Sequence, residues 1–243
     1  MKKYFQAPWS LKDIGIITGS IILLTAIVLG ILYFLPFRIS ANTPKSLYVL
    51  IIFLLQWVLI FAPLLFWTHR KHHLKWGNFG FEKIGILKAL GFIISAYFLY
   101  LGINFIISII IIYWNLKIPG FQIQESIFEL FGKDIFSIIM SGIMVVLIAP
   151  FVEEIFFRGF LLRTMCNKAG NIFGSVITAV VFTLLHFPWQ SFIPIFILGL
   201  IINSVVIKSK SIWPAIGFHI LNNGTAFTIL LLMEKGIISL DKL

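Results

Sequence analysis

The stretch that decides the fold is Ile135-Phe-Ser-Ile-Ile-Met-Ser-Gly-Ile-Met-Val-Val-Leu-Ile-Ala-Pro-Phe-Val-Glu-Glu-Ile-Phe-Phe-Arg-Gly-Phe-Leu-Leu162. It exceeds the roughly 20 mostly apolar residues that a membrane-spanning helix needs. It nevertheless contains two adjacent carboxylates, Glu153 and Glu154, with Arg158 one helical turn later. Ionisable side chains near the centre of a bilayer are costly, rare and usually functional. The chain has nine acidic residues, and only these two lie deep in apolar sequence, so they are candidates for function.

The composition of the whole chain is that of a membrane protein. Hydrophobic residues make up 60% of the 243 positions and charged residues only 12%, against about 25% charged residues in a soluble domain. We therefore predict an all-α, polytopic membrane helix bundle within the lipid bilayer. The formal net charge is +10, but the basic residues are scattered between apolar runs. This pattern favours positive-inside topology and contact with anionic lipid over nucleic-acid binding.

Seven segments have the apolar character of transmembrane helices, two of them short. The candidate spans are residues 14–37 (interpreted as uncleaved), 47–67, 85–113, 135–162, 172–188, 192–207 and 212–233. Between the third and fourth spans, the segment 121–134 has apolar residues at roughly helical spacing, which predicts a short amphipathic helix at the membrane interface. These residues are Phe121, Ile127, Phe128 and Phe131. We divide the chain into N-terminal transmembrane helices with the amphipathic segment, 1–134, and a core that contains the two carboxylates, 135–233, within one integrated membrane domain.

The distribution of basic residues predicts the orientation. With a cytoplasmic N-terminus, the inside receives twelve of the nineteen Lys and Arg residues and the outside six, while Arg158 lies within the membrane. This bias predicts a multi-pass protein of the cell membrane with its N-terminus inside and its C-terminus outside. The loop after the second span contains His69, His72 and His73, which could bind a metal, but a solvated basic loop is the favoured interpretation. Cys166 is the single cysteine, so no intrachain disulfide is possible.

The first polar motif is Glu-Glu-Ile-Phe-Phe-Arg, residues 153–158. Residues four apart share one face of a helix, whereas adjacent residues are rotated by about 100°. Glu154 and Arg158 can therefore pair, and Glu153 is left free for chemistry. Pro150 removes a backbone hydrogen bond and tends to kink a helix, which would open water access beside the carboxylates. Taken alone, the Glu154–Arg158 pair is equally consistent with an ion pair that only fastens helices.

Two further motifs lie in later spans. The second, Phe-Thr-Leu-Leu-His, ends at His186, and the third, His-Ile-Leu-Asn-Asn, runs from His219 to Asn223. Because His219 and Asn223 are four residues apart, both can face one cavity. At about 1.5 Å per residue from the cytoplasmic helix ends, Glu153 lies at ~15 Å, His219 at ~12 Å and His186 at ~22 Å. His186 is therefore too deep unless its helix is tilted or begins below the interface.

The polar residues also have structural interpretations. A lone histidine in a span often donates to a neighbouring carbonyl, and Asn222 and Asn223 alone could hold helices together. The joint occurrence of Glu, two His and Asn on nearby helices at similar depth favours a functional site instead.

The three motifs, Glu-Glu-x-x-x-Arg, Phe-x-x-x-His and His-x-x-x-Asn, resemble together the signature of the CAAX prenyl endopeptidase and bacteriocin-processing family of intramembrane proteases. The resemblance covers roughly residues 135–226, about two-fifths of the chain. It implies that Glu153 is the catalytic carboxylate and that His186 helps to hold and activate a water. It also implies that His219 and Asn223 bind the developing oxyanion or complete a metal site. The motif positions that would support the site are Glu154 and Arg158.

These residue types suit peptide hydrolysis. A carboxylate shielded from bulk water can act as a general base, and preorganised donors stabilise an oxyanion best where water is excluded. Alternatively, Glu153, His186 and His219 bind a divalent metal such as zinc, which would activate the water. The sequence contains no His-Glu-x-x-His motif, so the usual zinc-protease pattern is absent. Between these mechanisms we favour the one without metal.

The sequence therefore predicts an intramembrane endopeptidase that cleaves a membrane-associated peptide or protein. The resemblance implies prenylated CAAX proteins as substrates in eukaryotes, and elsewhere peptide processing or bacteriocin self-immunity. One alternative is a transporter or an ion or proton pathway, although the first half contains no second copy of the motifs. The other is a non-catalytic membrane scaffold. The substrate and the oligomeric state do not follow from the sequence.

Overall fold

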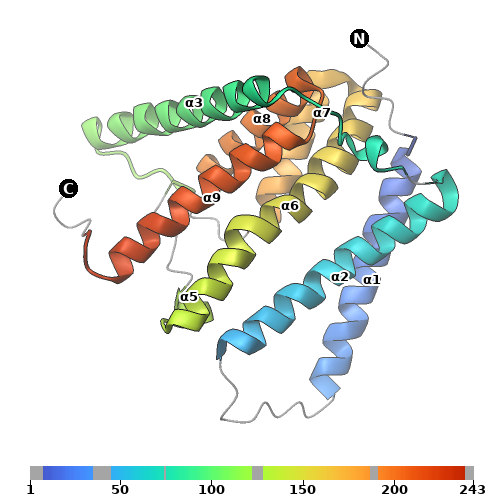
Figure 1. Ribbon diagram of the computed structural model, residues 1–243, viewed down its shortest axis with the longest axis horizontal. Helices are drawn as coiled ribbons and strands as arrows, with labels where there is room; N and C mark the ends of the chain where they lie inside the picture. Colours follow the sequence, from blue (N-terminus) through green and yellow to red (C-terminus); the bar gives the residue numbers. More distant parts are fainter. Residues whose placement is uncertain (1–7, 35–44, 74, 122–127, 187–190, 239–243) are drawn as a thin grey trace.

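The protein is a bundle of long helices, seen here in a computed structural model (Figure 1). The structure describes residues 8–34, 45–73, 75–121, 128–186 and 191–238. Within these ranges every regular element is helical, which confirms the predicted all-α membrane bundle. The elements are α1 (Leu11–Phe34), α2 (Lys45–His72), the 3₁₀ turn η1 (Trp76–Phe79), α3 (Ile86–Tyr113), α4 (Phe128–Phe131), α5 (Ile135–Gly142), the π-helical η2 (Ile143–Ile148), α6 (Ala149–Glu154), the π-helical η3 (Ile155–Leu162), α7 (Arg163–Leu184), α8 (Phe192–Ser209) and α9 (Trp213–Glu234).

Six helices in the described part of the chain are long and apolar enough to cross a membrane, against the seven predicted. The difference lies in Ile135–Leu184, whose 50 residues contain the fourth predicted span and nearly all of the fifth. Gly170 interrupts this run with φ 79 and ψ 168, a conformation that side chains disfavour. Beyond it, a Cβ on Gly174 would lie 2.5 Å from the backbone nitrogen of Cys166. Residues eight apart in a straight helix are about 12 Å apart, so the chain turns sharply here.

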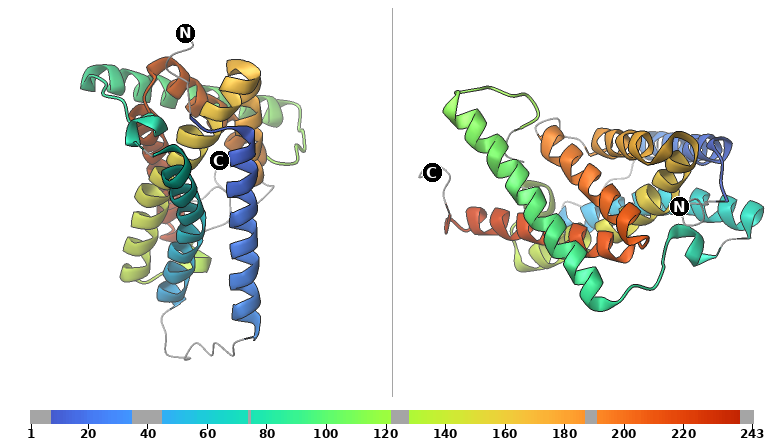
Figure 2. Two further views of the ribbon diagram at one scale, coloured as in Figure 1. Left: turned by 90° about the vertical axis from the view of Figure 1, so that its right-hand side faces the viewer. Right: turned by 90° about the horizontal axis from the view of Figure 1, so that it is seen from above.

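The helices pack as antiparallel neighbours with one strongly tilted member. In Figures 1 and 2, α1 and α2 lie side by side, while α3 crosses their direction at a wide angle and contacts α8 and α9. The 28 residues of α3 measure about 42 Å at 1.5 Å per residue. Because the hydrocarbon core is about 30 Å thick, a helix of this length must tilt to keep its apolar residues in lipid.

The segment predicted as a short interfacial amphipathic helix is helical in part where it is described, and its apolar side packs on the bundle. Residues 122–127, including Ile127, lie outside the described residues. In α4, Phe128 and Phe131 are buried. Their rings lie 5.5 Å from Phe227 and 5.4 Å from Phe53, on α9 and α2. This short helix therefore joins the second and last long helices.

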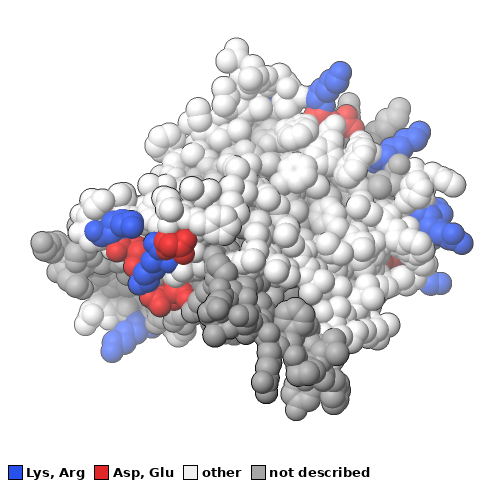
Figure 3. All heavy atoms as spheres, turned by 60° about the horizontal axis from the view of Figure 1, so that its bottom comes forward, with Lys and Arg blue, Asp and Glu red and all other residues white. Residues whose placement is uncertain are grey.

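Charged side chains gather at the ends of the bundle. Figure 3 shows two separate charged areas with a wide uncharged surface between them, as a protein within a bilayer requires. At one end, the Lys133 ammonium contacts Glu129 at 3.1 Å and Glu234 at 2.8 Å, which raises the pKa of Lys133 and links α4 to α9. Beside it, Asp134 caps α5 by accepting hydrogen bonds from the hydroxyl and N–H of Ser137, which lower the pKa of Asp134.

The opposite end is closed by the loop that follows α2. The Ile212 N–H donates to the Gly80 carbonyl at 2.9 Å, and the Ser211 hydroxyl donates to the Glu82 carbonyl at 2.7 Å. The Phe79 side chain packs so tightly on η3 that a Cβ on Gly159 would lie 3.0 Å away. The loop therefore fixes the start of α9, which carries His219 and Asn223, against η3, which carries Arg158.

Candidate active site

The two carboxylates lie on α6, which is flanked by the π-helical segments η2 and η3. A π-turn pairs each carbonyl with the N–H five residues later, and such turns often occur at functional sites. Five residues after Val145 comes Pro150, which has no N–H. The Val145 carbonyl instead accepts a hydrogen bond from the Asn223 amide at 3.0 Å. Pro150 is thus accommodated within a continuous helical run, and the carbonyl left free ties η2 to α9.

Glu154 is the centre of a buried ionic group. Its Oε1 atom accepts hydrogen bonds from Arg158 Nη1 at 2.8 Å and from His219 Nδ1 at 2.8 Å. The side chains of Glu154 and Arg158 are fully buried, and that of His219 is 2% exposed. The pairing predicted from the i, i+4 spacing is present, and it extends to a histidine on another helix. Because Glu154 holds Nδ1 of His219, it fixes the direction of the opposite ring nitrogen.

Glu153, the neighbour of Glu154, lies between the two histidines. Its Oε2 atom is 3.3 Å from His186 Nε2 and 3.8 Å from His219 Nε2. The side chains of Glu153 and His186 are 25% and 27% exposed, so a substrate or water can reach them more easily than the buried Glu154 group. The structure therefore brings together three groups that are 33 and 66 residues apart in sequence.

The hydrogen bonds made by the two rings determine what they present to Glu153. His186 Nδ1 lies 2.7 Å from the Phe182 carbonyl, which can only accept, so Nδ1 carries a proton. His219 Nδ1 likewise donates to the Glu154 carboxylate. In the neutral rings both Nε2 atoms are then acceptors, and both face the Glu153 oxygen, which is also an acceptor and has no hydrogen-bond partner. Three acceptors that converge in this way require a shared proton, or a cation or a donor such as water beside them.

Part of the chain is similar to a known protein family. Residues 135–225 match the family model of the type II CAAX prenyl endopeptidases, Rce1-like. The family resemblance inferred from the three motifs is thereby confirmed over the residues that carry them. No curated protein matches the chain, and no solved structure does.

The structure places His186 at the level of Glu153, contrary to the ~22 Å depth obtained by counting upright helical turns. His186 follows directly after α7 ends, where its N–H donates to the Thr183 carbonyl at 3.1 Å. That count assumed an upright helix that begins at Asn171. In the structure the chain turns at Gly170, inside α7. A backbone hydrogen bond thus holds His186 at the end of α7, and its ring faces the Glu153 carboxylate.

Asn223 makes contacts that differ from those of the other motif residues. Its Nδ2 atom donates to the Val145 carbonyl, and its Oδ1 lies 3.4 Å from Asn222 Nδ2. Among the described residues it has no hydrogen bond to the Glu153–His186–His219 group. A primary amide carries two N–H groups, so one remains available for a ligand.

One residue of the domain that sequence analysis missed is Asn203 on α8. It is fully buried; its Oδ1 accepts from Arg158 Nε at 3.0 Å, and its Nδ2 donates to the Ser175 carbonyl at 2.9 Å. The guanidinium of Arg158 also lies 4.3 Å from the centre of the Phe182 ring, which is 4.1 Å from the His186 ring. Asn203 and Phe182 therefore hold Arg158, and through it Glu154. The signal that could have identified Asn203 was its position as a buried amide in an apolar span.

Two histidine nitrogens and a carboxylate oxygen are a donor set that zinc accepts. Within the described residues, however, no group of three or more His, Cys, Asp or Glu side chains is arranged to hold a metal ion. The same finding covers His69, His72 and His73 in the loop after α2. We therefore derive the chemistry from the side chains of the chain itself.

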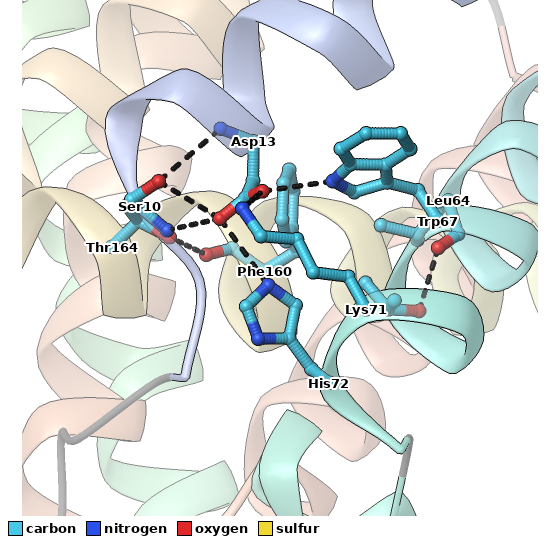
Figure 4. A network of polar contacts seen from close by, with 9 residues as sticks. Ser10, Asp13, Leu64, Trp67, Lys71, His72, Phe160 and Thr164 are labelled. Carbon is cyan, nitrogen blue, oxygen red and sulfur yellow. Dashed lines mark hydrogen bonds and ion pairs between the residues drawn. The ribbon is translucent and has the colours of Figure 1, made fainter.

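A second carboxylate cluster lies at the end of the bundle that carries the start of α1 (Figure 4). Asp13 is fully buried and accepts hydrogen bonds from the Ser10 N–H at 2.7 Å and hydroxyl at 2.8 Å, and from Trp67 Nε1 at 2.8 Å. Lys71 Nζ lies 2.6 Å from Oδ1, and His72 Nε2 lies 3.3 Å from Oδ2. Sequence analysis did not single out Asp13, and it favoured a solvated loop for His72.

Proposed function

We propose that this protein is an intramembrane endopeptidase in which Glu153 and His186 activate a water and His219 and Asn223 stabilise the oxyanion. The Rce1-like domain supports the coarser assignment, a CAAX protease-type membrane endopeptidase. The observation that carries the residue roles is the approach of two Nε2 atoms, His186 at 3.3 Å and His219 at 3.8 Å, to one oxygen of Glu153. The Nδ1 atom of each ring already has a hydrogen-bond partner, the Phe182 carbonyl for His186 and the Glu154 carboxylate for His219. The site is therefore organised before substrate binds.

In the proposed reaction, a water lies beside Glu153 and His186, within hydrogen-bond reach of both. The carboxylate accepts a proton from the water while the water oxygen attacks the peptide carbonyl. When the C–N bond of the tetrahedral intermediate breaks, Glu153 returns the proton to the leaving amine. General base catalysis of this kind contributes about 10²–10⁴-fold to the rate.

The oxyanion requires donors on the other side of the site. A second proton on His219, at Nε2, makes the ring a donor at both nitrogens, and the Glu154 carboxylate at Nδ1 stabilises that charged form. The Asn223 N–H that is not bound to Val145 supplies another donor. A single such donor is worth about 10²–10³ in kcat. Arg158 holds the Glu154 carboxylate in place at 2.8 Å and therefore supports the position of His219.

The proposed substrate is a membrane-associated peptide or protein, since Glu153 and His186 are partly exposed within a membrane bundle. Processing of, or immunity to, bacteriocin-type peptides is one form that this activity would take. We also propose an N-terminus inside the cell and a C-terminus outside. The end of the bundle with the start of α1 and the end of α2 contains Lys12, Arg70, Lys71 and Lys75, and an excess of basic residues is typical of the cytoplasmic side.

The proposal is tested with Glu153→Gln, compared with Glu129→Gln, which changes an exposed glutamate (73% exposed) in the same way. Both variants are purified in detergent and assayed by mass spectrometry for cleavage of a prenylated CAAX peptide and of an unprenylated hydrophobic peptide. We expect Glu153→Gln to lose about 10²–10⁴-fold in cleavage rate and Glu129→Gln to retain the wild-type rate. Wild-type cleavage by Glu153→Gln would contradict the assigned base.

A transport function can be distinguished from proteolysis with the same wild-type and variant proteins. Reconstituted vesicles with a pH-sensitive dye report proton movement. Proton flux in the wild type that Glu153→Gln abolishes, without cleavage of either peptide, would identify a proton pathway. Cleavage by the wild type without flux supports the protease.

A further inference from the structure

A groove of about 590 Å³ lies between α3 and α8. This volume falls within the range of about 300–1,000 Å³ that is typical of ligand sites. Most of the wall is apolar, and Gly91, Ser95 and Ser204 in it are exposed. Asn203, the neighbour of Ser204, is buried and directed at Arg158. The groove therefore faces outward, on the side of α8 away from the candidate active site.

The groove is built from two facing stripes of residues at helical spacing. On α3 these include Lys88, Gly91, Ser95 and Leu99, and on α8 they include Ser204 and Lys208. Lys88 is near the start of α3 and Lys208 near the end of α8, and both line the same groove. No acidic side chain lines it, and neither lysine has an ion pair among the described residues. The groove is thus apolar along its length, with two cationic groups near these helix ends.

The length of the groove matches one leaflet of a bilayer. From Lys88 to Leu99 is eleven residues, or about 16 Å along α3 at 1.5 Å per residue. Half of the hydrocarbon core is about 15 Å. A ligand with its charged part at the lysines would therefore have room along α3 for a length of acyl chain comparable with one leaflet.

We propose that this groove binds one anionic phospholipid, with its phosphate between Lys88 and Lys208 and an acyl chain along Gly91 and Ser95. A Cβ on Gly91 would meet nothing within 4 Å, so the groove is open where the chain would lie. A peptide is a poor occupant, because its backbone N–H and C=O groups need partners in lipid. The groove offers few, since the Ser204 hydroxyl already donates to the Leu200 carbonyl at 2.9 Å.

The first test measures lipid binding to the purified full-length protein by native mass spectrometry. The probes are phosphatidylglycerol and phosphatidylcholine with identical acyl chains. We expect the wild type to retain phosphatidylglycerol preferentially. The double variant Lys88→Gln/Lys208→Gln should bind it on the order of tenfold more weakly, since each lysine near the surface attracts anionic lipid. The control Lys12→Gln/Lys75→Gln removes two exposed lysines outside the groove and should retain wild-type affinity.

The second test fills the groove. Gly91→Leu and Gly102→Leu make the same change on α3, and neither new Cβ would meet an atom within 4 Å. Only Gly91 lines the groove. We expect Gly91→Leu to lose bound phosphatidylglycerol and Gly102→Leu to keep it. Equal binding by these two variants, undiminished binding by Lys88→Gln/Lys208→Gln, or equal affinity for both phospholipids would each overturn the proposal.

Discussion

Asp13 and Glu153 are both carboxylates in apolar surroundings with histidine beside them, but they differ in what their oxygens meet. Each Asp13 oxygen receives donors, from Ser10, Trp67 and Lys71 (Figure 4). Among the described residues, the polar atoms next to Oε2 of Glu153 are the Nε2 atoms of His186 and His219, which are acceptors in the neutral rings. A carboxylate whose oxygens all accept hydrogen bonds from the protein stabilises the fold. A carboxylate surrounded by acceptors can instead bind a proton or a water.

The largest expected change in unfolding free energy follows from removing Asp13, whose two oxygens both accept hydrogen bonds. Asp13→Ala should lower the free energy of unfolding by about 3 kcal/mol, at the low end of the cost of breaking a buried pair. The cost is at the low end because the Lys71 side chain is 42% exposed and can be rehydrated. Denaturant unfolding in detergent micelles measures the change. Glu129→Ala, at an exposed site, is the control.

Cleavage per folded molecule should remain close to wild type in Asp13→Ala, because Asp13 contacts none of Glu153, His186 or His219 in the structure. A loss of cleavage as large as that of Glu153→Gln, in protein that is still folded, would show that the two clusters do not have separate roles.

The next largest change is expected at Asn203, which holds Arg158 behind the candidate active site. Asn203→Leu keeps the volume but removes the acceptor of Arg158 Nε. We expect a loss of about 2 kcal/mol in unfolding free energy, since hydrogen bonds to charged groups are worth about 1.5–3 kcal/mol. Cleavage should also fall, because Arg158 then no longer holds Glu154 and His219 in place. Ser204→Ala, which removes a hydroxyl bonded only within α8, should have little effect on either measurement.

A smaller change separates the contributions within the Asp13 cluster. Trp67→Phe retains an aromatic ring but removes the Nε1 donor to Asp13. We expect a loss of about 1 kcal/mol, the net value of one hydrogen bond, because Ser10 and Lys71 still satisfy the carboxylate. Differential unfolding curves of Trp67→Phe and Asp13→Ala, measured together with the double variant, test this. Fully additive effects would mean that the indole contributes through packing and not through Asp13.

Much of the fold follows from the sequence, because the apolar runs, the turns and the basic loops obey membrane rules. The spans 85–113 and 135–162 agree with α3 and with the run α5–η3 almost to the residue. The sharp turn at Gly170 was less visible, since a positive φ at one glycine leaves no pattern in composition. The i, i+4 rule also correctly paired Glu154 with Arg158.

The parts that sequence did not predict depend on contacts between distant helices. Asp13 looked like a residue at a span end, and only the packing of α1 on α2 brings Trp67, Lys71 and His72 around it. Asn203 was overlooked because a single amide in an apolar run has many possible partners. The depth of His186 was misjudged because helix tilt is set by packing and cannot be counted from residue number.

The smallest effect is the most discriminating, because the same chemical change should have opposite signs in the two clusters. Glu153→Gln replaces an acceptor by an amide whose N–H can donate to His186 or His219 Nε2. We expect the free energy of unfolding to rise by about 0.5 kcal/mol, a modest net hydrogen bond, while cleavage is lost. Asp13→Asn instead directs an N–H at the Lys71 and Trp67 donors and should destabilise.

Unfolding curves of Glu153→Gln, Asp13→Asn and the wild type measure the sign of each stability change. If Glu153→Gln is destabilised as strongly as Asp13→Asn, the Glu153 oxygen is already satisfied in the folded protein. Its role would then be structural, like that of Asp13. A gain in stability combined with a loss of cleavage is the behaviour expected of a group whose unsatisfied oxygen is maintained for reaction, since catalytic sites often reduce stability.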